Sequence, residues 1–145
     1  MNMIREEVTL LDGTIEVREY PELQRPIGDV KAIKLSALAN RRWQATQFFQ
    51  FDGVKAPADS AMTAITATAV AINLGLRDPT ETIIWKLADG EFRQWLLSDL
   101  LTYANAVQTH IQACFNHEAL LSGLIQSADS ADDVEAISIE AGWPS

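Results

Sequence analysis

Cysteine and basic residues are scarce in this sequence of 145 residues, and each scarcity excludes a class of protein. A single cysteine, Cys114, cannot form an intramolecular disulfide, which favours a reducing, cytosolic site of synthesis. The 11 Lys and Arg residues stand against 20 Asp and Glu, so the net charge is −9. Because nucleic-acid binding depends largely on basic residues that contact phosphates, nucleic acid is not an expected partner.

Long apolar runs are also missing, although the chain is rich in hydrophobic residues. No stretch of about 18 apolar residues occurs, so we expect no membrane-spanning segment and no membrane partner. Residues 1–20 alternate charged and apolar side chains and lack the apolar core of a signal peptide. Hydrophobic residues make up 48% of the chain, which is enough for a sizeable core in one domain of ordinary length.

Charge is divided unevenly along the chain. No Lys or Arg follows Arg93, whereas seven acids do. The segment 30–51, by contrast, holds four basic residues and no acid. One interpretation is that the two segments attract each other within the chain, and the other is a charged docking surface for a partner protein.

Residues 6–19 have the pattern of a β-hairpin. Asp12-Gly13 fits a two-residue type I′ turn, which requires positive φ at both positions. Counting outward from that turn places four apolar side chains on one face. The expected pairs are Leu10 with Ile15 and Val8 with Val17. An isolated two-stranded hairpin is marginal in water, so this face must pack on the rest of the chain, on another copy or on a partner.

The remaining chain divides by periodicity and by end signals into helices and a second hairpin. In order, we expect a helix over 29–49 with Asp29 as its cap, a turn at Asp52-Gly53, a loop over 55–59, a helix over 61–74 ended by Gly75, a hairpin over 82–95 around Asp89-Gly90, a helix over 98–127 and a short helix opened by a capping box at Ser130. The predicted fold class is therefore α+β. An N-terminal hairpin and connector occupy residues 1–28, and a mainly helical domain with one long helix and a β-hairpin occupies residues 29–145.

Two details of these elements bear on packing. The inner positions of the long helix alternate three and four residues apart, as in coiled coils, and Glu118 is the only break in that apolar seam. In the second hairpin a two-residue turn places Lys86 opposite Arg93, a like-charge pair that should meet the acids of the C-terminal segment.

His110, Cys114 and His117 are the best candidates for metal ligands or for catalysis. Their spacing puts all three on one face of the long helix, near enough to meet a zinc ion with Glu118 close by. The alternative is structural, because Cys114 lies in the apolar seam and a free cysteine is commonly buried as a small hydrophobe. We expect no bound metal and no cofactor.

The sequence contains none of the motifs that mark phosphate-binding loops, zinc proteases or serine hydrolases, so nothing in it argues for an enzyme. The four tryptophans are the remaining unusual feature, and core packing explains them most simply. Trp143 is the exception, because a terminal Gly-Trp-Pro either docks back onto the core or offers an aromatic anchor to a partner.

Several ordered motifs resemble those of an uncharacterised bacteriophage tail domain. They are Arg42-Trp43, Trp85-Lys86-Leu87-Ala88-Asp89-Gly90, the helical series Ala104, Ala106, Val107, His110, Cys114, Phe115, Glu118, Ala119 and Leu121, and the closing Ile139-Glu140-Ala141-Gly142-Trp143-Pro144. The resemblance covers about residues 41–144. It implies a protein encoded among phage tail genes, near tail fibres and their assembly chaperones, and it brings no enzymatic role.

The expected function is therefore that of a non-enzymatic tail-fibre-binding protein, which assists fibre folding, assembly or attachment in the host cytoplasm. The expected contact residues are Val8, Leu10, Ile15 and Val17, with Trp143 second. The alternative is a structural component of the virion tail that joins the baseplate to the fibre. The expected partners are accordingly the tail fibre protein, a baseplate protein or a second copy of the chain. A small metalloenzyme that uses His110, Cys114 and His117 is a third hypothesis.

Overall fold

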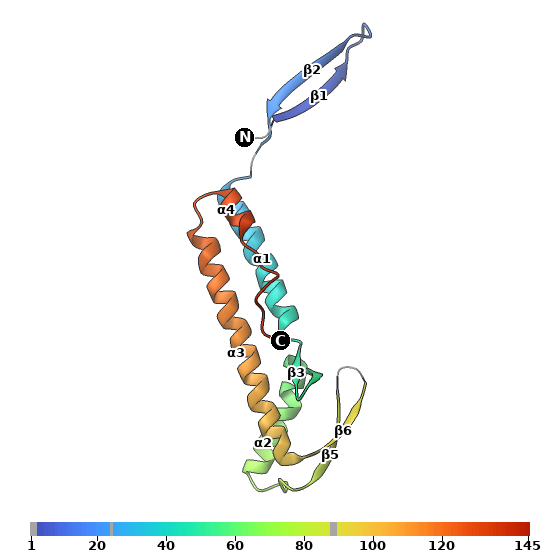
Figure 1. Cartoon of the computed structure of the whole chain (residues 1–145), viewed down its shortest axis with the longest axis vertical. Coiled ribbons are helices and arrows are strands. Elements are labelled where there is room, and N and C mark those ends of the chain that lie inside the picture. The colour runs from blue at the N-terminus through green and yellow to red at the C-terminus, as the bar shows by residue number, and fades with distance from the viewer. Residues whose placement is uncertain (1–2, 24, 88–89) are drawn as a thin grey trace.

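The computed structural model describes residues 3–23, 25–87 and 90–145, and these form an elongated molecule (Figure 1). A hairpin of β1 (Met3–Thr9) and β2 (Ile15–Pro21) stands apart from the helices at one end. The elements that follow are α1 (Ile27–Ala45), β3 (Phe48–Phe51), β4 (Val54–Pro57), the 3₁₀ turn η1 (Asp59–Ala61), α2 (Met62–Asn73), β5 (Thr82–Lys86), β6 (Phe92–Leu96), α3 (Leu97–Ser127) and α4 (Ala131–Ala136). The predicted α+β class is confirmed, and each sheet in the described chain is a two-stranded antiparallel hairpin.

Helix α3 runs along the whole body, and the core lies in two clusters along it (Figure 1). Near its C-terminus, α3 packs against α1 and α4. That cluster contains Val30, Leu38, Leu121, Ile125 and Val134. Near its N-terminus, α3 packs against α2 and the short strands around Tyr103 and Val107. Among the described residues no helix, α3 included, is long and apolar enough to cross a membrane.

The second cluster is built from aromatic rings around Tyr103. The rings of Phe49, Phe51, Trp85 and Trp95 all lie within 5.7 Å of the Tyr103 ring, measured between centroids. The buried Tyr103 hydroxyl donates a hydrogen bond to the backbone oxygen of Pro57. These rings come from β3, β5, β6 and α3, so the cluster joins two of the hairpins to the long helix.

The segment after α1 differs from the prediction. The predicted helix over 29–49 begins earlier, at Ile27, and ends at Ala45. The residues that follow form the β3–β4 hairpin, so the predicted loop over 55–59 is wrong where it overlaps β4. Asp52 and Gly53 both have positive φ, 52° and 79°, and they make the two-residue turn that joins the strands. Phe48 and Phe49 alternate between exposed and buried, which is strand periodicity.

The N-terminal hairpin exists, but its predicted register is wrong by one residue. The Leu10 N–H donates to the Thr14 oxygen at 2.8 Å, and the Gly13 N–H donates to the Leu10 oxygen at 2.9 Å. Gly13 has φ +84°, so the loop holds three residues and ends in a left-handed glycine. Val8 therefore lies opposite Glu16, and Thr9 lies opposite Ile15. The predicted pairs Leu10–Ile15 and Val8–Val17 do not form.

The second hairpin carries the same error. The Leu87 N–H donates to the Glu91 oxygen at 2.8 Å and the Gly90 N–H to the Leu87 oxygen at 3.1 Å, while Asp89 of the predicted turn lies outside the described residues. Lys86 consequently lies opposite Phe92, and the predicted Lys86–Arg93 pair does not form. Arg93 pairs with Asp52 at 3.9 Å and Glu91 at 3.4 Å, and not with an acid of the C-terminal segment. The corrected register also places Trp85 and Trp95 on one face, where their rings stack.

Because Tyr103 is buried, the free energy of unfolding depends on pH in the alkaline range. Burial raises the pKa of Tyr103 from 10.0 to about 12, and the neighbouring Trp85 indole lowers it to a smaller extent. Between these pH values the unfolded phenol ionises while the folded one stays protonated, so the free energy of unfolding falls as pH rises, by up to about 1.4 kcal/mol per unit. We expect urea unfolding of Tyr103→Phe to lack this part of the alkaline decline.

The matched control is Tyr20→Phe, which removes an exposed hydroxyl on β2 and should keep the decline of the original chain. Equal alkaline declines in the original chain and in Tyr103→Phe would contradict the assignment.

Candidate functional site

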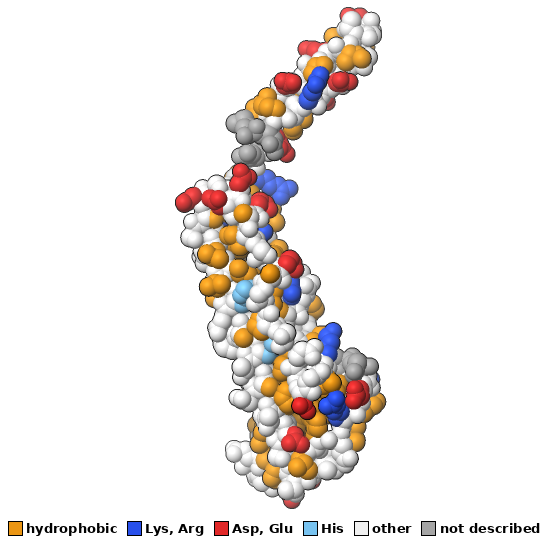
Figure 2. All heavy atoms as spheres, viewed as in Figure 1, with side chains coloured by type: hydrophobic (Ala, Val, Ile, Leu, Met, Phe, Trp, Pro, Cys, Tyr) orange, Lys and Arg blue, Asp and Glu red, His pale blue; other side chains and the backbone are white. Residues whose placement is uncertain are grey.

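The β1–β2 hairpin is the first candidate interaction surface. All its strand side chains are exposed except Val8, which is half-buried. Ile15 and Val17 are 65% and 45% exposed, and Leu10 in the loop is also exposed. In Figure 2 apolar and charged side chains alternate over this end of the molecule. Three of the five predicted contact residues, Leu10, Ile15 and Val17, are thus exposed to a partner, and Val8 and Trp143 are half-buried.

The structure does not bring those four side chains onto one face. Residues directly opposite each other in a hairpin share a face, so Val8 lies with Glu16, and Val17 lies with Glu7. Leu10 shares the face of Val8, and Ile15 shares the face of Val17. The slip of one residue divides the predicted patch between the two sides of the hairpin. Each side therefore mixes apolar and charged side chains, and the contact role of the four residues stays a prediction.

The basic segment of α1 meets the acidic C-terminal segment within the chain, as the first of the two charge interpretations predicts. Arg42 Nε donates to Glu118 Oε2 at 2.9 Å, and both side chains are about three-quarters covered. Arg41 Nε donates to Glu140 Oε2 at 3.2 Å. The Arg42 guanidinium also lies over the Phe115 ring, 4.7 Å from its centroid. Glu118, the break in the apolar seam, is therefore the acceptor that holds Arg42 between α1 and α3.

The C-terminal Gly-Trp-Pro docks back onto the body. The Trp143 indole N–H donates to the Ile139 oxygen at 2.8 Å, and its ring meets the His117 ring edge-on at 4.6 Å. Gly142 has φ +86°, and a Cβ at this position would lie 2.8 Å from His117 Cε1. Of the two predicted alternatives for Trp143, the structure has the docked one. Its role as a contact for a partner stays a prediction.

The two histidines of the candidate metal set point to separate acceptors. His110 Nε2 lies 2.8 Å from the Ala45 oxygen, and His117 Nε2 lies 3.0 Å from the Ala141 oxygen. A carbonyl oxygen only accepts, so each Nε2 carries hydrogen and has no lone pair for a metal. Among the described residues no group of three His, Cys, Asp or Glu side chains is placed to hold a metal ion.

Cys114 is buried next to His110, but the pair is not arranged as a nucleophile and base. Its Sγ lies 3.7 Å from His110 Nε2, the nitrogen that already donates to Ala45 and so does not accept the thiol proton. Burial raises the pKa of the Cys114 thiol, which Arg42 and Arg41 lower to a smaller extent. A buried protonated thiol is a packing residue.

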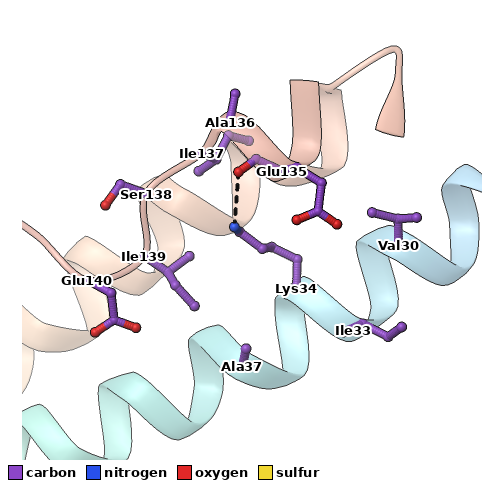
Figure 3. Close-up of a pocket in the computed structure, with 10 residues that line it drawn as sticks. All are labelled: Val30, Ile33, Lys34, Ala37, Glu135, Ala136, Ile137, Ser138, Ile139 and Glu140. Carbon is purple, nitrogen blue, oxygen red and sulfur yellow. Dashed lines mark hydrogen bonds between the residues drawn. The ribbon is translucent and has the colours of Figure 1, made fainter. Parts of the chain in front are cut away.

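A groove of about 480 Å³ lies between α1 and the chain after α4 (Figure 3). Lys34 crosses it from α1, and its Nζ donates to the backbone oxygen of Glu135 at 3.5 Å. Val30, Ile33 and Ile139 add apolar lining. The groove thus marks the line along which α4 and the C-terminal segment dock on α1.

Sequence reasoning missed a second exposed apolar surface, the outer face of the β5–β6 hairpin. Ile84, Phe92 and Leu96 all lie exposed there, at the end of the molecule far from β1–β2 (Figure 1). The wrong register hid this face, because it assigned Phe92 and Ile84 to different sides. The signal that was available is the shared Leu-x-Asp-Gly sequence of the two hairpins, at Leu10 and at Leu87.

Replacing Gly142 by alanine should undock the C-terminal segment. The positive φ and the contact with His117 together predict a loss of about 1–3 kcal/mol. The measurement is urea unfolding followed by circular dichroism. Gly123→Ala is the control, because Gly123 lies in α3 with free space around it, and there we expect a gain of about 0.5–1 kcal/mol. A Gly142→Ala protein as stable as the original chain would show that the docked conformation contributes nothing.

The Arg42–Glu118 pair should couple more strongly than an exposed ion pair. In a double-mutant cycle with Arg42→Met and Glu118→Gln, we expect a coupling energy of about 1–3 kcal/mol, since each single change leaves a largely covered charge unpaired. The exposed Arg77–Glu81 pair, 2.8 Å apart on the surface, is the control at about 0.3–0.5 kcal/mol. Equal coupling in the two cycles would overturn the structural role given to Glu118.

Comparison with known proteins identifies a family for most of the chain. Residues 29–141 match the model of a family described as a domain of unknown function, DUF4376. No curated protein and no solved structure matches the chain. The matched residues run from the third residue of α1 past the end of α4 and exclude the β1–β2 hairpin. Because the match covers well over half of the 145 residues, the chain belongs to the DUF4376 family.

Proposed function

We propose that this chain is a non-enzymatic protein that binds a bacteriophage tail fibre through its β1–β2 hairpin and assists the folding, assembly or attachment of that fibre. The observation that carries the proposal is the hairpin itself. It stands away from the helices with exposed apolar side chains on both faces and with no third strand among the described residues.

The hairpin needs a second surface. Two strands alone bury too little apolar area to be stable in water, and in the described part of the chain β1–β2 stands apart from the helices (Figure 1). The total accessible surface of the chain is 9471 Å², whereas about 7,400 Å² is typical of a compact monomer of this mass. This excess of about a quarter in accessible surface supports the proposal that the chain functions in contact with another protein.

The resemblance of residues 41–144 to an uncharacterised phage tail domain supports a tail fibre as that partner. Fibre subunits expose strand edges and apolar surface before they trimerise, and such edges aggregate readily. The hairpin offers backbone groups along both outer edges and apolar side chains beside them, so it can cover a fibre edge by strand addition. The proposed place of this interaction is the host cytoplasm, during assembly.

The mixed charge on the hairpin suits a reversible contact. Arg18 Nη2 pairs with Glu16 Oε2 at 3.1 Å, and both side chains are about half exposed. Charged side chains near a strand edge limit indiscriminate pairing. The hairpin therefore favours a partner whose edge carries complementary charges over pairing with any exposed strand.

A structural role in the virion is the second candidate, and one observation favours it. The molecule carries exposed apolar sheet surface at both ends, β1–β2 at one and the Ile84, Phe92 and Leu96 face at the other (Figure 1). Such a rod could join a baseplate protein to a fibre. Stoichiometric amounts of the chain in purified particles would favour this adaptor role, and its absence would favour a transient chaperone.

Co-expression with a bacteriophage tail fibre protein tests the fibre proposal. We expect more soluble, trimeric fibre with the original chain than without it. The variant Val8→Ser/Leu10→Ser should lose at least half of that gain, since it removes the apolar contacts of one hairpin face. The readout is the yield of trimeric fibre by size-exclusion chromatography.

The control is Leu74→Ser/Leu76→Ser, which removes two leucines after α2, 65% and 74% exposed and away from the hairpin. It should assist the fibre as well as the original chain does. The proposal fails if trimeric fibre appears equally with and without the protein, or if both double variants behave alike.

A further inference from the structure

The outer edge of β2 is built to pair with a copy of itself. We propose that two copies of this chain associate through their β2 strands, antiparallel and centred on Val17, to form one continuous four-stranded sheet. The pairing involves this chain alone, so it stands or fails independently of fibre binding.

Backbone geometry gives the first argument. In an antiparallel pair, residues alternate between hydrogen-bonded and non-hydrogen-bonded positions. The Leu10 N–H donates to the Thr14 oxygen, and Thr9 and Ile15 form the next pair along, so their backbone groups point away from each other. Counting on along β2, residues 15, 17 and 19 direct their N–H and C=O groups to the free outer edge. A second β2 strand can accept and donate at all three.

Charge selects the register on that edge. With Val17 on the two-fold axis, Glu16 of each copy lies opposite Arg18 of the other, which makes two opposite-charge pairs. Moving the two-fold axis by one residue, to Glu16 or to Arg18, shifts the pairing by two residues and puts Glu16 opposite Glu16 or Arg18 opposite Arg18. The Val17 register is therefore the one near the strand centre in which no like charges face each other.

The outer edge of β1 does not offer this arrangement. Its central residues are Arg5, Glu6 and Glu7, and a two-fold axis at any of them sets like charges directly opposite. Pairing across β2 also leaves Pro21 at the end of the strand, where its missing N–H costs little. The edge of β2 is thus the better dimerisation edge of the two.

The paired sheet would solve the stability problem of the isolated hairpin. A sheet of four strands with apolar side chains can be stable in water, whereas a hairpin of two strands is marginal. Val17 of each copy meets its equivalent, with Ile15 diagonal to it, while Val8 and Leu10 stay accessible on the other face. Two copies would then present a double-width sheet with their helical bodies at its two ends.

The charges can be tested by mixing two variants. Glu16→Arg places two arginines on each edge, and Arg18→Glu places two glutamates there. The homodimer of each variant alone should therefore have a dissociation constant at least about tenfold higher than that of the original chain. Mixed in equal amounts, they should form a heterodimer, because every cross-strand pair is then of opposite charge. The measurement is sedimentation velocity of the full chain, alone and mixed.

The backbone edge is tested by proline. Val17→Pro removes the outward N–H on the proposed axis and should abolish the dimer without breaking a hydrogen bond inside the hairpin. Glu7→Pro removes the equivalent outward N–H on β1, directly opposite Val17, and should leave the dimer intact.

Three results would overturn the proposal. One is that the original chain stays monomeric up to about 1 mM, which means that the free energy of association is weaker than about 4 kcal/mol. Another is a dimer or trimer that persists in Val17→Pro, which would place the interface on another surface such as the helical body. The last is a mixture of Glu16→Arg and Arg18→Glu that sediments as monomers.

Discussion

The apolar seam of α3 is the interaction on which the rest of the body depends. A helix of 31 residues is about 46 Å long, and no single neighbour among the described elements covers that length. Helices α1 and α4 cover its C-terminal half, and α2 with the aromatic cluster around Tyr103 covers the other. Between the two clusters the contacts become polar, at Arg42–Glu118 and at His110. These contacts link α1 to α3 by hydrogen bonds, from Arg42 to Glu118 and from His110 to the Ala45 oxygen.

The same thin architecture explains why candidate interaction surfaces lie at the ends of the molecule. Two packed helices bury one face each, so a hairpin attached beyond them has nothing of its own chain to pack against. The β1–β2 hairpin is in that position, and it is also the part outside the family match that begins at residue 29. The family match thus covers the helical body and leaves out the hairpin on which the fibre contact is proposed.

Helices with a sustained apolar periodicity and clear end signals could be predicted from the sequence, whereas the strand registers of the hairpins could not. The glycine that ends α2 and the cap at Ser130, whose Oγ accepts the Asp133 N–H at 3.1 Å, agree with the structure. The α3 seam agrees at most of its positions, but its spacing leaves out Tyr103 and His110, which are buried. Asp-Gly, however, makes a two-residue turn at Asp52-Gly53 and part of a three-residue loop at Asp12-Gly13. The dipeptide does not determine which, because the loop length depends on the φ of the aspartate and on packing of the strands beyond. Short apolar runs such as Phe48–Phe51 were equally ambiguous between helix and strand.

The central claim is that the β1–β2 hairpin owes its order to a contact outside its own chain. Amide hydrogen exchange at a series of protein concentrations measures this most directly, with α3 as the internal reference. We predict that protection of residues 3–21 rises with concentration and that protection in α3 stays constant. Hairpin protection that is already complete in dilute solution, and unchanged on concentrating the protein, would contradict the account.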